Sequence, residues 1–319
     1  MATPLLDVLI VGGGPAGLSL AGALARQLYT AVVFDNGTYR NARATHMHNV
    51  LGWDHQSPEA FRAKGREDIL SRYETITVES TTIQQVRKID AGFEATNDKG
   101  QTWTGRKLAL ATGVRDTFPD IPGFADCWGR GIFHCLYCHG YEQRGQRSVG
   151  VLMTGFITTA EKGMHMGHMA RRLAGNVVLY TNGSETLADE LKSALMKDKN
   201  SEDGTITVDS RAISTLRMGT QSESSVVITF SEGGEAEEGF LVNAPVTKVN
   251  SPLAEQLSLE LSDGGDILTT PPFFESSVPG VFAIGDCGVQ MKAVPVATYS
   301  GTMAAAGIGF QIIGEGSGL

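Results

Sequence analysis

The chain has few cysteines, no surplus of positive charge and no long uninterrupted apolar run. Four cysteines among 319 residues are too few for a secreted disulfide framework. The formal net charge of -9 argues against nucleic-acid or anionic-membrane partners, because their surfaces would repel the chain. Glycines interrupt the apolar stretch from Val8 to Ala25 and no basic residue precedes it, so it resembles neither a signal peptide nor a membrane span. We expect a cytoplasmic protein. The negative charge does not argue against a small-molecule partner.

The chain does have the length and the apolar content for two domains, each with its own core. Among its cysteines only Cys135 and Cys138 are closely spaced, and a histidine flanks each of them. This spacing permits three interpretations: a redox disulfide, half of a zinc site, or two buried thiols. Cys127 and Cys287 are interpreted as small buried hydrophobic residues.

A glycine-rich turn near the N-terminus joins a predicted strand, Asp7 to Val11, to a small-residue helix expected to end at about Leu28. The turn has the pattern G-x-G-x-x-G. Its first glycine allows a tight turn, its second lets backbone approach a pyrophosphate, and its third lets helix and strand pack closely. The helix N-terminus offers unpaired N–H groups and a positive dipole end to the phosphates. The residues expected at this site are Gly12, Gly14, Pro15, Ala16 and Gly17.

An acidic residue completes this pattern. A second predicted strand, Ala31 to Phe34, ends at Asp35, whose carboxylate can accept both hydroxyls of an adenosine ribose. Strand, glycines, helix, strand and acid in this order predict a dinucleotide site. The pattern does not distinguish FAD from NAD(P).

Two further segments, Leu108 to Gly113 and Ser277 to Asp286, resemble recurring elements of the flavoprotein disulfide reductases. The resemblance implies that the first segment passes beside FAD and that Asp286 hydrogen-bonds the ribityl or phosphate portion of the flavin. It also implies that a helix with Pro295 in its first turn points its N-terminus at the flavin pyrimidine. FAD is thus the expected cofactor, with these further binding residues: Ala111, Thr112, Gly113, Asp286 and Val294.

The order of these segments resembles the low-molecular-weight thioredoxin reductases over essentially the whole chain. The implied fold class is α/β, with two Rossmann-like dinucleotide-binding domains, the second inserted into the first. The FAD-binding domain is expected at residues 1–117 and 248–319, and the inserted domain at residues 118–247. The resemblance makes the cysteine pair a redox disulfide, with Cys138 nearer the flavin and Cys135 exchanging with substrate. No metal is expected, because no second pair of ligands stands at a suitable distance.

The chain departs from the reductase pattern at two places. His139 follows the second cysteine where the reductases place an aspartate, and an imidazole suits removing a proton from an incoming thiol. After a strand expected at Ser148 to Met153, Thr154 and Phe156 stand where the first two glycines of an NADPH turn belong. The next predicted strand, Asn176 to Tyr180, is not followed by basic residues. We therefore expect a degenerate NADPH-type site in the inserted domain.

With these departures the chain resembles the fungal FAD-dependent dithiol oxidases of gliotoxin-type (epipolythiodioxopiperazine) biosynthesis. The resemblance implies a homodimer that oxidises a small-molecule dithiol and passes the electrons to O2, which gives H2O2. The catalytic residues would be Cys135, Cys138 and His139. An NADPH-dependent thioredoxin or small-disulfide reductase and a non-enzymatic flavin-binding redox sensor remain alternatives. Candidate walls of a substrate pocket are Trp53, Phe133, Tyr137, Phe156, His46 and His48.

Overall fold

The computed structural model describes residues 4–201 and 203–317. The chain divides into two compact units, one formed by Met1–Arg115 with Thr247–Leu319 and the other by Asp116–Val246. Strands β7 (Val114–Thr117) and β16 (Val246–Val249) pair with each other where the chain passes between the units.

The first unit is built on a nine-stranded sheet in the order β17-β18-β19-β6-β1-β2-β3, with the β4–β5 hairpin joined to β6 through β5. Strands β3, β2, β1, β6 and β19 are parallel neighbours. Parallel strands covered on both faces are apolar along their length, and all four residues of β2 are buried. The strands of this sheet are β1 (Leu6–Val11), β2 (Ala31–Phe34), β3 (Ile76–Glu79), β4 (Ile83–Ile89), β5 (Gly92–Asn97), β6 (Thr102–Leu110), β17 (Thr269–Thr270), β18 (Glu275–Ser276) and β19 (Val281–Ala283).

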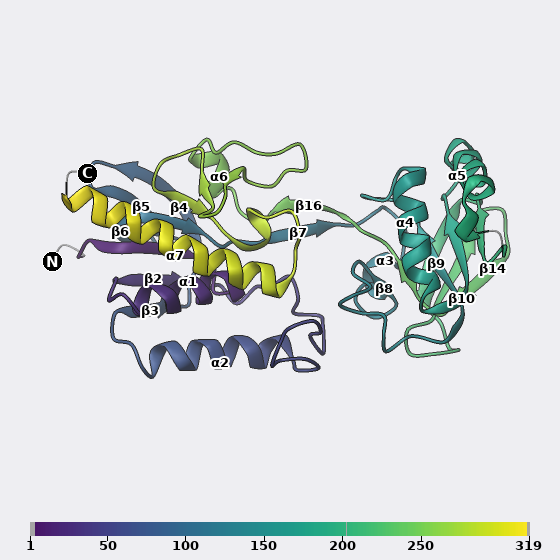
Figure 1. Ribbon diagram of the computed structural model, residues 1–319, viewed down its shortest axis with the longest axis horizontal. Helices are drawn as coiled ribbons and strands as arrows, with labels where there is room; N and C mark the ends of the chain where they lie inside the picture. The colour runs from purple at the N-terminus through teal and green to yellow at the C-terminus, as the bar shows by residue number, and fades with distance from the viewer. Residues whose placement is uncertain (1–3, 202, 318–319) are drawn as a thin grey trace. The chain divides into compact units, whose positions relative to one another are not determined.

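Helices α1 and α7 run beside each other in the first unit (Figure 1). Their contact is close because it is made by small residues: a Cβ atom added to Gly301 would lie 2.3 Å from the carbonyl oxygen of Ala16. Val8 and Ile10 of β1 pack toward these helices. Leu9 packs on the opposite face of the sheet with Phe93 of β5. The helices of this unit are α1 (Pro15–Ala25), α2 (Pro58–Leu70), α6 (Leu253–Gln256), the 3-10 helix η2 (Gly285–Cys287) and α7 (Val294–Ser317).

The first helix ends earlier than the sequence predicts. Its apolar composition continues to Leu28, but α1 ends at Ala25. Leu28 has a left-handed backbone, with φ of 60°, and the N–H of Tyr29 donates to the carbonyl oxygen of Leu24 at 3.2 Å. The chain has to reverse here to enter β2 at Ala31, and a left-handed residue is a common way to end a helix. Composition does not reveal this reversal.

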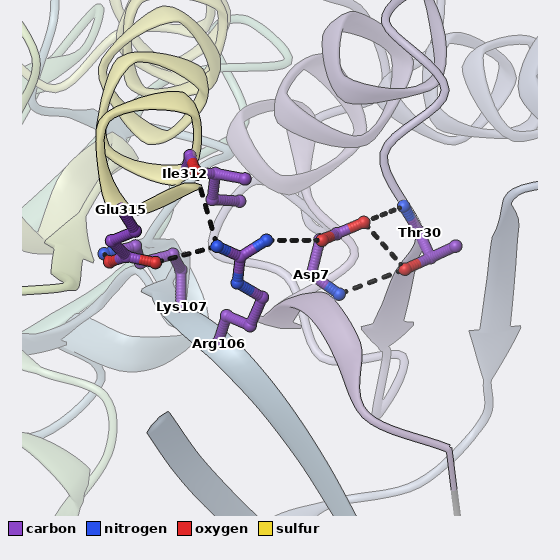
Figure 2. Close-up of polar contacts among 6 residues, drawn as sticks. All are labelled: Asp7, Thr30, Arg106, Lys107, Ile312 and Glu315. Carbon is purple, nitrogen blue, oxygen red and sulfur yellow. Dashed lines mark hydrogen bonds and ion pairs between the residues drawn. The ribbon is translucent and has the colours of Figure 1, made fainter. Parts of the chain in front are cut away.

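A polar cluster ties the last turns of α7 to the start of the sheet (Figure 2). Arg106 of β6 donates to Glu315 at 2.9 Å and lies 3.5 Å from the carboxylate of Asp7, which in turn accepts from Thr30 at 2.9 Å. Lys107 donates to the same Glu315 at 2.5 Å, and its side chain is only 7% exposed. The cluster therefore joins β1, β6 and the C-terminal helix through charge-assisted hydrogen bonds.

The second unit holds a five-stranded parallel sheet in the order β11-β10-β9-β15-β8 and an antiparallel β12-β13-β14 sheet. Apolar clusters pack on both faces of the parallel sheet. The strands are β8 (Ile132–Phe133), β9 (Gln146–Leu152), β10 (Ala174–Tyr180), β11 (Ile206–Asp209), β12 (Ile213–Met218), β13 (Val226–Phe230), β14 (Glu235–Glu238) and β15 (Leu241–Val242). The helices are α3 (Phe124–Cys127), α4 (Ala160–Arg171), α5 (Glu185–Lys197) and the 3-10 helix η1 (Lys199–Ser201).

The fold class expected from the sequence is confirmed. Each unit contains a parallel sheet with β-α-β connections, β1-α1-β2 in the first and β9-α4-β10 in the second. Within the described residues, no helix has both the length and the apolar content needed to cross a membrane.

Candidate active site

The three glycines of the first turn meet three different structural demands. Gly12 has φ of 123°, and an added Cβ atom would lie 2.2 Å from the carbonyl oxygen of Ala111. A Cβ atom on Gly17 would lie 1.9 Å from the carbonyl oxygen of Gly12. A Cβ atom on Gly14 would meet nothing within 4 Å. Internal packing thus explains the first and third glycines, whereas Gly14 leaves backbone accessible to a ligand.

Helix α1 begins beside this open position. Gly14 is its N-cap in an extended conformation, no side chain caps the helix, and Pro15 occupies the first turn. The first backbone N–H groups of such a helix have no partner within it, and its dipole is positive at this end. An uncapped helix N-terminus beside an open glycine fits the pyrophosphate of a dinucleotide.

Register brings the other expected segments to the same edge. Val11 pairs with Leu110 on β6, and Leu110 pairs with Ala283 on β19. The strand ends are fixed by hydrogen bonds from Ala111 N to Val11 O at 2.8 Å and from Ile284 N to Leu110 O at 2.9 Å. The residues after these strands, from Ala111 to Gly113 and from Gly285 to Asp286, therefore lie next to the glycine turn.

The first turns of α1 and α7 also meet at this edge. A Cβ atom on Gly285 would lie 2.9 Å from that of Ala16 in α1 and 3.8 Å from that of Ala297 in α7. Lys292 holds the loop that leads into α7, donating to Asp266 Oδ1 at 2.7 Å and to the carbonyl oxygen of Asp286 at 3.0 Å. Asp286 and the α7 N-terminus at Val294 are thus held in one short, hydrogen-bonded segment.

Asp35 is 5% exposed and already has several protein donors. Its Oδ1 accepts from Gly37 N at 3.0 Å, and its Oδ2 accepts from the Tyr39 hydroxyl at 2.6 Å and from Arg66. A carboxylate has about four acceptor sites, so about one remains. Asp35 can accept both ribose hydroxyls, as the sequence predicts, only if one of these donors moves.

Sequence reasoning missed the cations around this carboxylate. Arg62 and Arg66 lie four residues apart on α2, and this spacing puts both on one face of the helix. The Arg62 guanidinium lies over the Tyr39 ring, 3.8 Å from its centroid. Burial, followed by the hydrogen bond to Asp35, raises the pKa of the Tyr39 hydroxyl. The i, i+4 arginine pair was visible in the sequence, but its partner lies 31 positions from Arg66.

Cys135 and Cys138 form a disulfide in the second unit, in the turn after β8, with their Cα atoms 5.2 Å apart. Both cysteines are half-buried. The Cys138 and His139 N–H groups donate to the carbonyl oxygen of Cys135 at 3.1 and 2.9 Å, and the Cys138 N–H also lies 3.1 Å from Cys135 Sγ. An amide donor at a sulfur stabilises its thiolate form. Leu136 is buried and Tyr137 is exposed, so the turn is anchored on one side only.

Both flanking histidines stack on buried aromatic rings. The His139 ring lies 5.3 Å from the Phe133 ring at an interplanar angle of 23°. The His134 ring lies 5.6 Å from that of Trp128 at 25°. Stacking engages the faces of the imidazoles, whereas proton transfer takes place at their edges. The stacked arrangement is thus compatible with either a packing role or a proton-transfer role.

The other two cysteines lie in the apolar interior. Cys127 and Cys287 are both fully buried, which confirms their interpretation as small hydrophobic residues. Burial raises the pKa of the Cys127 thiol to about 11, and burial also raises that of Cys287. Because the thiolate is the nucleophile in exchange reactions, neither thiol is suited to disulfide chemistry.

Residues 6–301 match the pyridine nucleotide-disulphide oxidoreductases. The chain belongs to this family. It is 44% identical over 315 residues to thioredoxin reductase aclD of Aspergillus oryzae, with 98% of each chain covered. It is 41% identical to thioredoxin reductase sirT of Leptosphaeria maculans, covering 97% of this chain and 95% of that one. The crystal structure of an oxidoreductase from Agrobacterium tumefaciens superposes with a TM-score of 0.84 at 28% identity, over 97% of this chain and 99% of the other.

Pyridine nucleotide-disulphide oxidoreductases and thioredoxin reductases are FAD-binding flavoproteins. The cofactor expected from the sequence, FAD, is therefore confirmed, and the protein is an oxidoreductase. The resemblance to thioredoxin reductases over the whole chain is confirmed as well. The open, uncapped edge described above fits this cofactor.

The turn after β9 is where the sequence predicts a degenerate NADPH-type site. Here the Phe156 side chain is 58% exposed at this turn, and the Lys162 ammonium lies 3.5 Å from its ring centroid. Lys162 also donates to the carbonyl oxygen of Phe156 at 3.0 Å, and the Thr159 hydroxyl caps α4 by accepting from Lys162 N at 3.4 Å. Protein groups thus already engage the N-terminus of α4.

The segment after β10 is similarly engaged. The Ser184 hydroxyl caps α5, accepting from Leu187 N at 3.4 Å. Arg211, from the loop after β11, donates to Asp209 at 2.6 Å and lies over the Phe230 ring, 3.6 Å from its centroid. This arginine is already paired within the protein.

The candidate pocket walls differ in their surroundings. Phe133 is 4% exposed and packs in the core of the second unit, so its interpretation as a pocket wall is wrong. Tyr137 is 76% exposed. In the first unit His46 stacks on His55 with 4.3 Å between ring centroids, and Trp53 packs edge-on against Phe61 at 5.4 Å. His48 Nδ1 lies 3.6 Å from Asp54.

Proposed function

We propose that this protein is an FAD-dependent dithiol oxidase. It forms an intramolecular disulfide in a small-molecule dithiol of the epipolythiodioxopiperazine type, through the Cys135–Cys138 disulfide, with O2 as the electron acceptor and H2O2 as the product. The relatives named thioredoxin reductases are consistent with a substrate that exchanges thiols and disulfides. Whether the protein is a dithiol oxidase or a reductase depends on the direction in which electrons flow between the cysteine pair and FAD.

The contacts at the turn after β9 are the observation that supports electron flow from a dithiol rather than from NADPH. A nucleotide pyrophosphate needs backbone N–H groups at a helix N-terminus and glycine where the chain comes close to it. At this turn a benzyl group, a lysine bonded to the local backbone and a threonine cap stand in that place. These contacts support a degenerate NADPH-type site. An enzyme of this family without a pyridine nucleotide must draw its electrons from another donor, and a dithiol is the donor that a redox disulfide accepts.

The exchange at the cysteine pair balances without a further reactant. One substrate thiolate attacks Cys135 Sγ, which breaks the Cys135–Cys138 bond and releases Cys138 as a thiolate. The second substrate thiolate attacks the substrate sulfur of the mixed disulfide, which closes the product ring and releases Cys135. The substrate loses two electrons and two protons, and the cysteines gain them. The Cys138 N–H beside Cys135 Sγ supports Cys135 as the leaving thiolate in the second step.

His139 is the proposed base for the incoming thiol. Its backbone N–H is bonded to Cys135 O, so its imidazole belongs to the same turn as the reactive sulfur. Its ring is oriented by stacking on the buried Phe133. An imidazole accepts a proton near neutral pH, where a free thiol is mostly protonated.

The proposed FAD site lies at the carboxyl edge of the first sheet, in an FAD domain of residues 1–117 and 248–319 interrupted by the cysteine-bearing domain at 118–247. FAD held there would supply the two-electron acceptor for the reduced cysteine pair, with O2 as the final acceptor. The binding residues we propose are Gly12, Gly14, Pro15, Ala16, Gly17, Asp35, Ala111, Thr112, Gly113, Asp286 and Val294. Their convergence at one edge supports this set.

A second candidate function is an NADPH-dependent thioredoxin or small-disulfide reductase. The names of the relatives at 41–44% identity favour it. In that enzyme electrons would run from NADPH to the cysteine pair, opposite to the direction proposed here. The turn after β9 would then have to rearrange around Phe156 to admit the nucleotide.

An anaerobic titration of the purified yellow protein separates these functions. We expect dithiothreitol, used as the dithiol probe, to bleach the flavin absorbance, and NADPH at the same concentration to leave it unchanged. Admission of air should restore the colour and yield one H2O2 per dithiol consumed. Rapid bleaching by NADPH would overturn the proposal, and bleaching that air does not reverse would indicate a redox sensor without turnover.

A further inference from the structure

An ion pair that no motif predicts stands at the FAD edge of the first unit. Arg40 Nη1 lies 3.0 Å from Asp286 Oδ2, although the two residues are 246 positions apart. The two side chains are only 18% and 20% exposed. Arg40 comes from the loop after β2, and Asp286 directly follows Gly285, which packs against the first turn of α1. The guanidinium thus pairs with the carboxylate of the residue next to the one that packs on the first turn of α1.

The charges at this edge require a cation. Asp35 and Asp286 bring two carboxylates to the place where an anionic pyrophosphate is expected, in a chain whose net charge is already -9. The N-terminus of α1 contributes only roughly +0.5 of an elementary charge. Arg66 pairs with Asp35 and Arg40 pairs with Asp286. Each carboxylate therefore pairs with an arginine, and Arg40 is the one paired with the residue that follows Gly285.

We propose that Arg40 is a cofactor-binding residue that contacts the FAD pyrophosphate while it remains paired with Asp286. A guanidinium presents five N–H donors in a planar fork, so one edge can hold the carboxylate while another donates to a phosphate oxygen. A single ammonium lacks this planar geometry. The inference concerns the cofactor site and holds for either direction of electron flow.

The test is the affinity of the apoprotein for FAD, measured by the quenching of flavin fluorescence in Arg40→Gln. We expect the dissociation constant to rise roughly 10- to 100-fold, the range for losing a charge-assisted hydrogen bond. Riboflavin, which lacks phosphate, should bind wild type and variant equally. Arg72→Gln is the matched control, because it also removes an arginine from an ion pair, with Asp68, but on an exposed face of the first unit. Its FAD affinity should equal that of wild type.

Two outcomes would overturn the proposal. One is an FAD affinity of Arg40→Gln within about twofold of wild type, well below the loss expected for a phosphate contact. The other is full recovery of affinity in Arg40→Gln/Asp286→Asn, which would mean that Arg40 only neutralises Asp286. If the variant does not fold, phenylglyoxal labelling of the wild-type apoprotein decides. FAD and ADP should protect Arg40 from modification and riboflavin should not, and equal labelling with and without FAD would contradict the contact.

Discussion

At the scale of single residues, the two thiols of the Cys135–Cys138 turn differ in their backbone surroundings. The Cys138 N–H lies 3.1 Å from Cys135 Sγ. Among the hydrogen bonds of the described residues, no comparable amide donor to Cys138 Sγ is found. Because a donor favours the thiolate, it supports the release of Cys135 in the second exchange step, when Cys135 leaves the mixed disulfide with substrate.

Substitution of either cysteine by serine tests the disulfide itself. We expect Cys135→Ser and Cys138→Ser each to lower dithiol-dependent O2 consumption by more than about 1,000-fold, since loss of a covalent nucleophile costs at least this much in comparable enzymes. Both variants should retain FAD, because the proposed FAD site lies in the other unit. Dithiol oxidation is measured with an oxygen electrode.

Cys127→Ala is the control for these variants, because Cys127 is a fully buried cysteine of the same unit with a raised thiol pKa. It should turn over at the wild-type rate. Wild-type O2 consumption by Cys135→Ser would show that the flavin accepts electrons from the dithiol directly, and the proposed route through the cysteines would be wrong.

The site residues that the sequence points to are those whose expected roles depend on spacing along the chain. The turn glycines, Asp35 at the end of β2 and the cysteine pair each follow from a short pattern. Arg40 and Arg66 were missed because their partners, Asp286 and Asp35, lie 246 and 31 positions away. Contacts of this kind are created by the packing of elements and leave no periodic signal in one sequence.

At the scale of elements, the C-terminal helix α7 depends on its last charged turn. Glu315 accepts from Lys107 at 2.5 Å and from Arg106 at 2.9 Å (Figure 2). Lys107 is 7% exposed and Glu315 is 48% exposed on their side chains. The pair is therefore intermediate between a surface ion pair and a buried one. Removing the carboxylate leaves the nearly buried ammonium without its partner.

We expect Glu315→Gln to lower the free energy of unfolding of the first unit by about 1–2 kcal/mol, between the cost of breaking an exposed pair and that of a buried one. Lys107→Met/Glu315→Gln should be more stable than Glu315→Gln, because the double variant has no ammonium to bury. Urea unfolding of the three proteins measures this. Equal stability of wild type and Glu315→Gln would contradict a stabilising role of the cluster.

The same contact has a pH dependence of known sign. Partial burial raises the pKa of Glu315, but the hydrogen bonds from Lys107 and Arg106 outweigh it, so the pKa of the folded state lies below the usual range. A carboxyl with a depressed folded pKa contributes stability above its unfolded pKa, about 4.3, and loses it as pH falls through the folded pKa. The difference between wild type and Glu315→Gln should therefore be constant near neutrality and shrink below about pH 4.

Element boundaries show where sequence patterns stop being informative. The β-α-β order of both units follows from alternating apolar runs and glycines, and β2 begins and ends where expected. The end of α1 differs from the position that the sequence predicts, because the left-handed backbone at Leu28 is set by the return of the chain to the sheet. The sequence shows Phe156 in the turn after β9, but the lysine and threonine contacts of this turn appear only in three dimensions.

At the scale of the whole molecule, the exposed face of α7 carries large apolar side chains. Tyr299, Phe310 and Ile313 are 52%, 67% and 63% exposed, and Ala306 lies between them on the same face. The spacings of seven, four and three residues along the chain place all four on one stripe of the helix. A stripe of this kind typically packs against another apolar surface. We propose that it meets a second copy of this chain, in keeping with the homodimer that the sequence resemblance implies.

Phe310→Glu tests this assembly, because it introduces a charge at the centre of the stripe, and a desolvated unpaired charge opposes association. Light scattering of the wild type should give about twice the chain mass of 33.9 kDa, and that of the variant one chain mass at the same concentration. Met196→Glu, at an 84% exposed position on α5 of the other unit, is the control and should remain dimeric. A monomeric wild type, or a Phe310→Glu variant that keeps the dimeric mass, would show that α7 does not form the interface. Retention of FAD by the monomeric variant would further show that the cofactor site is complete within one chain.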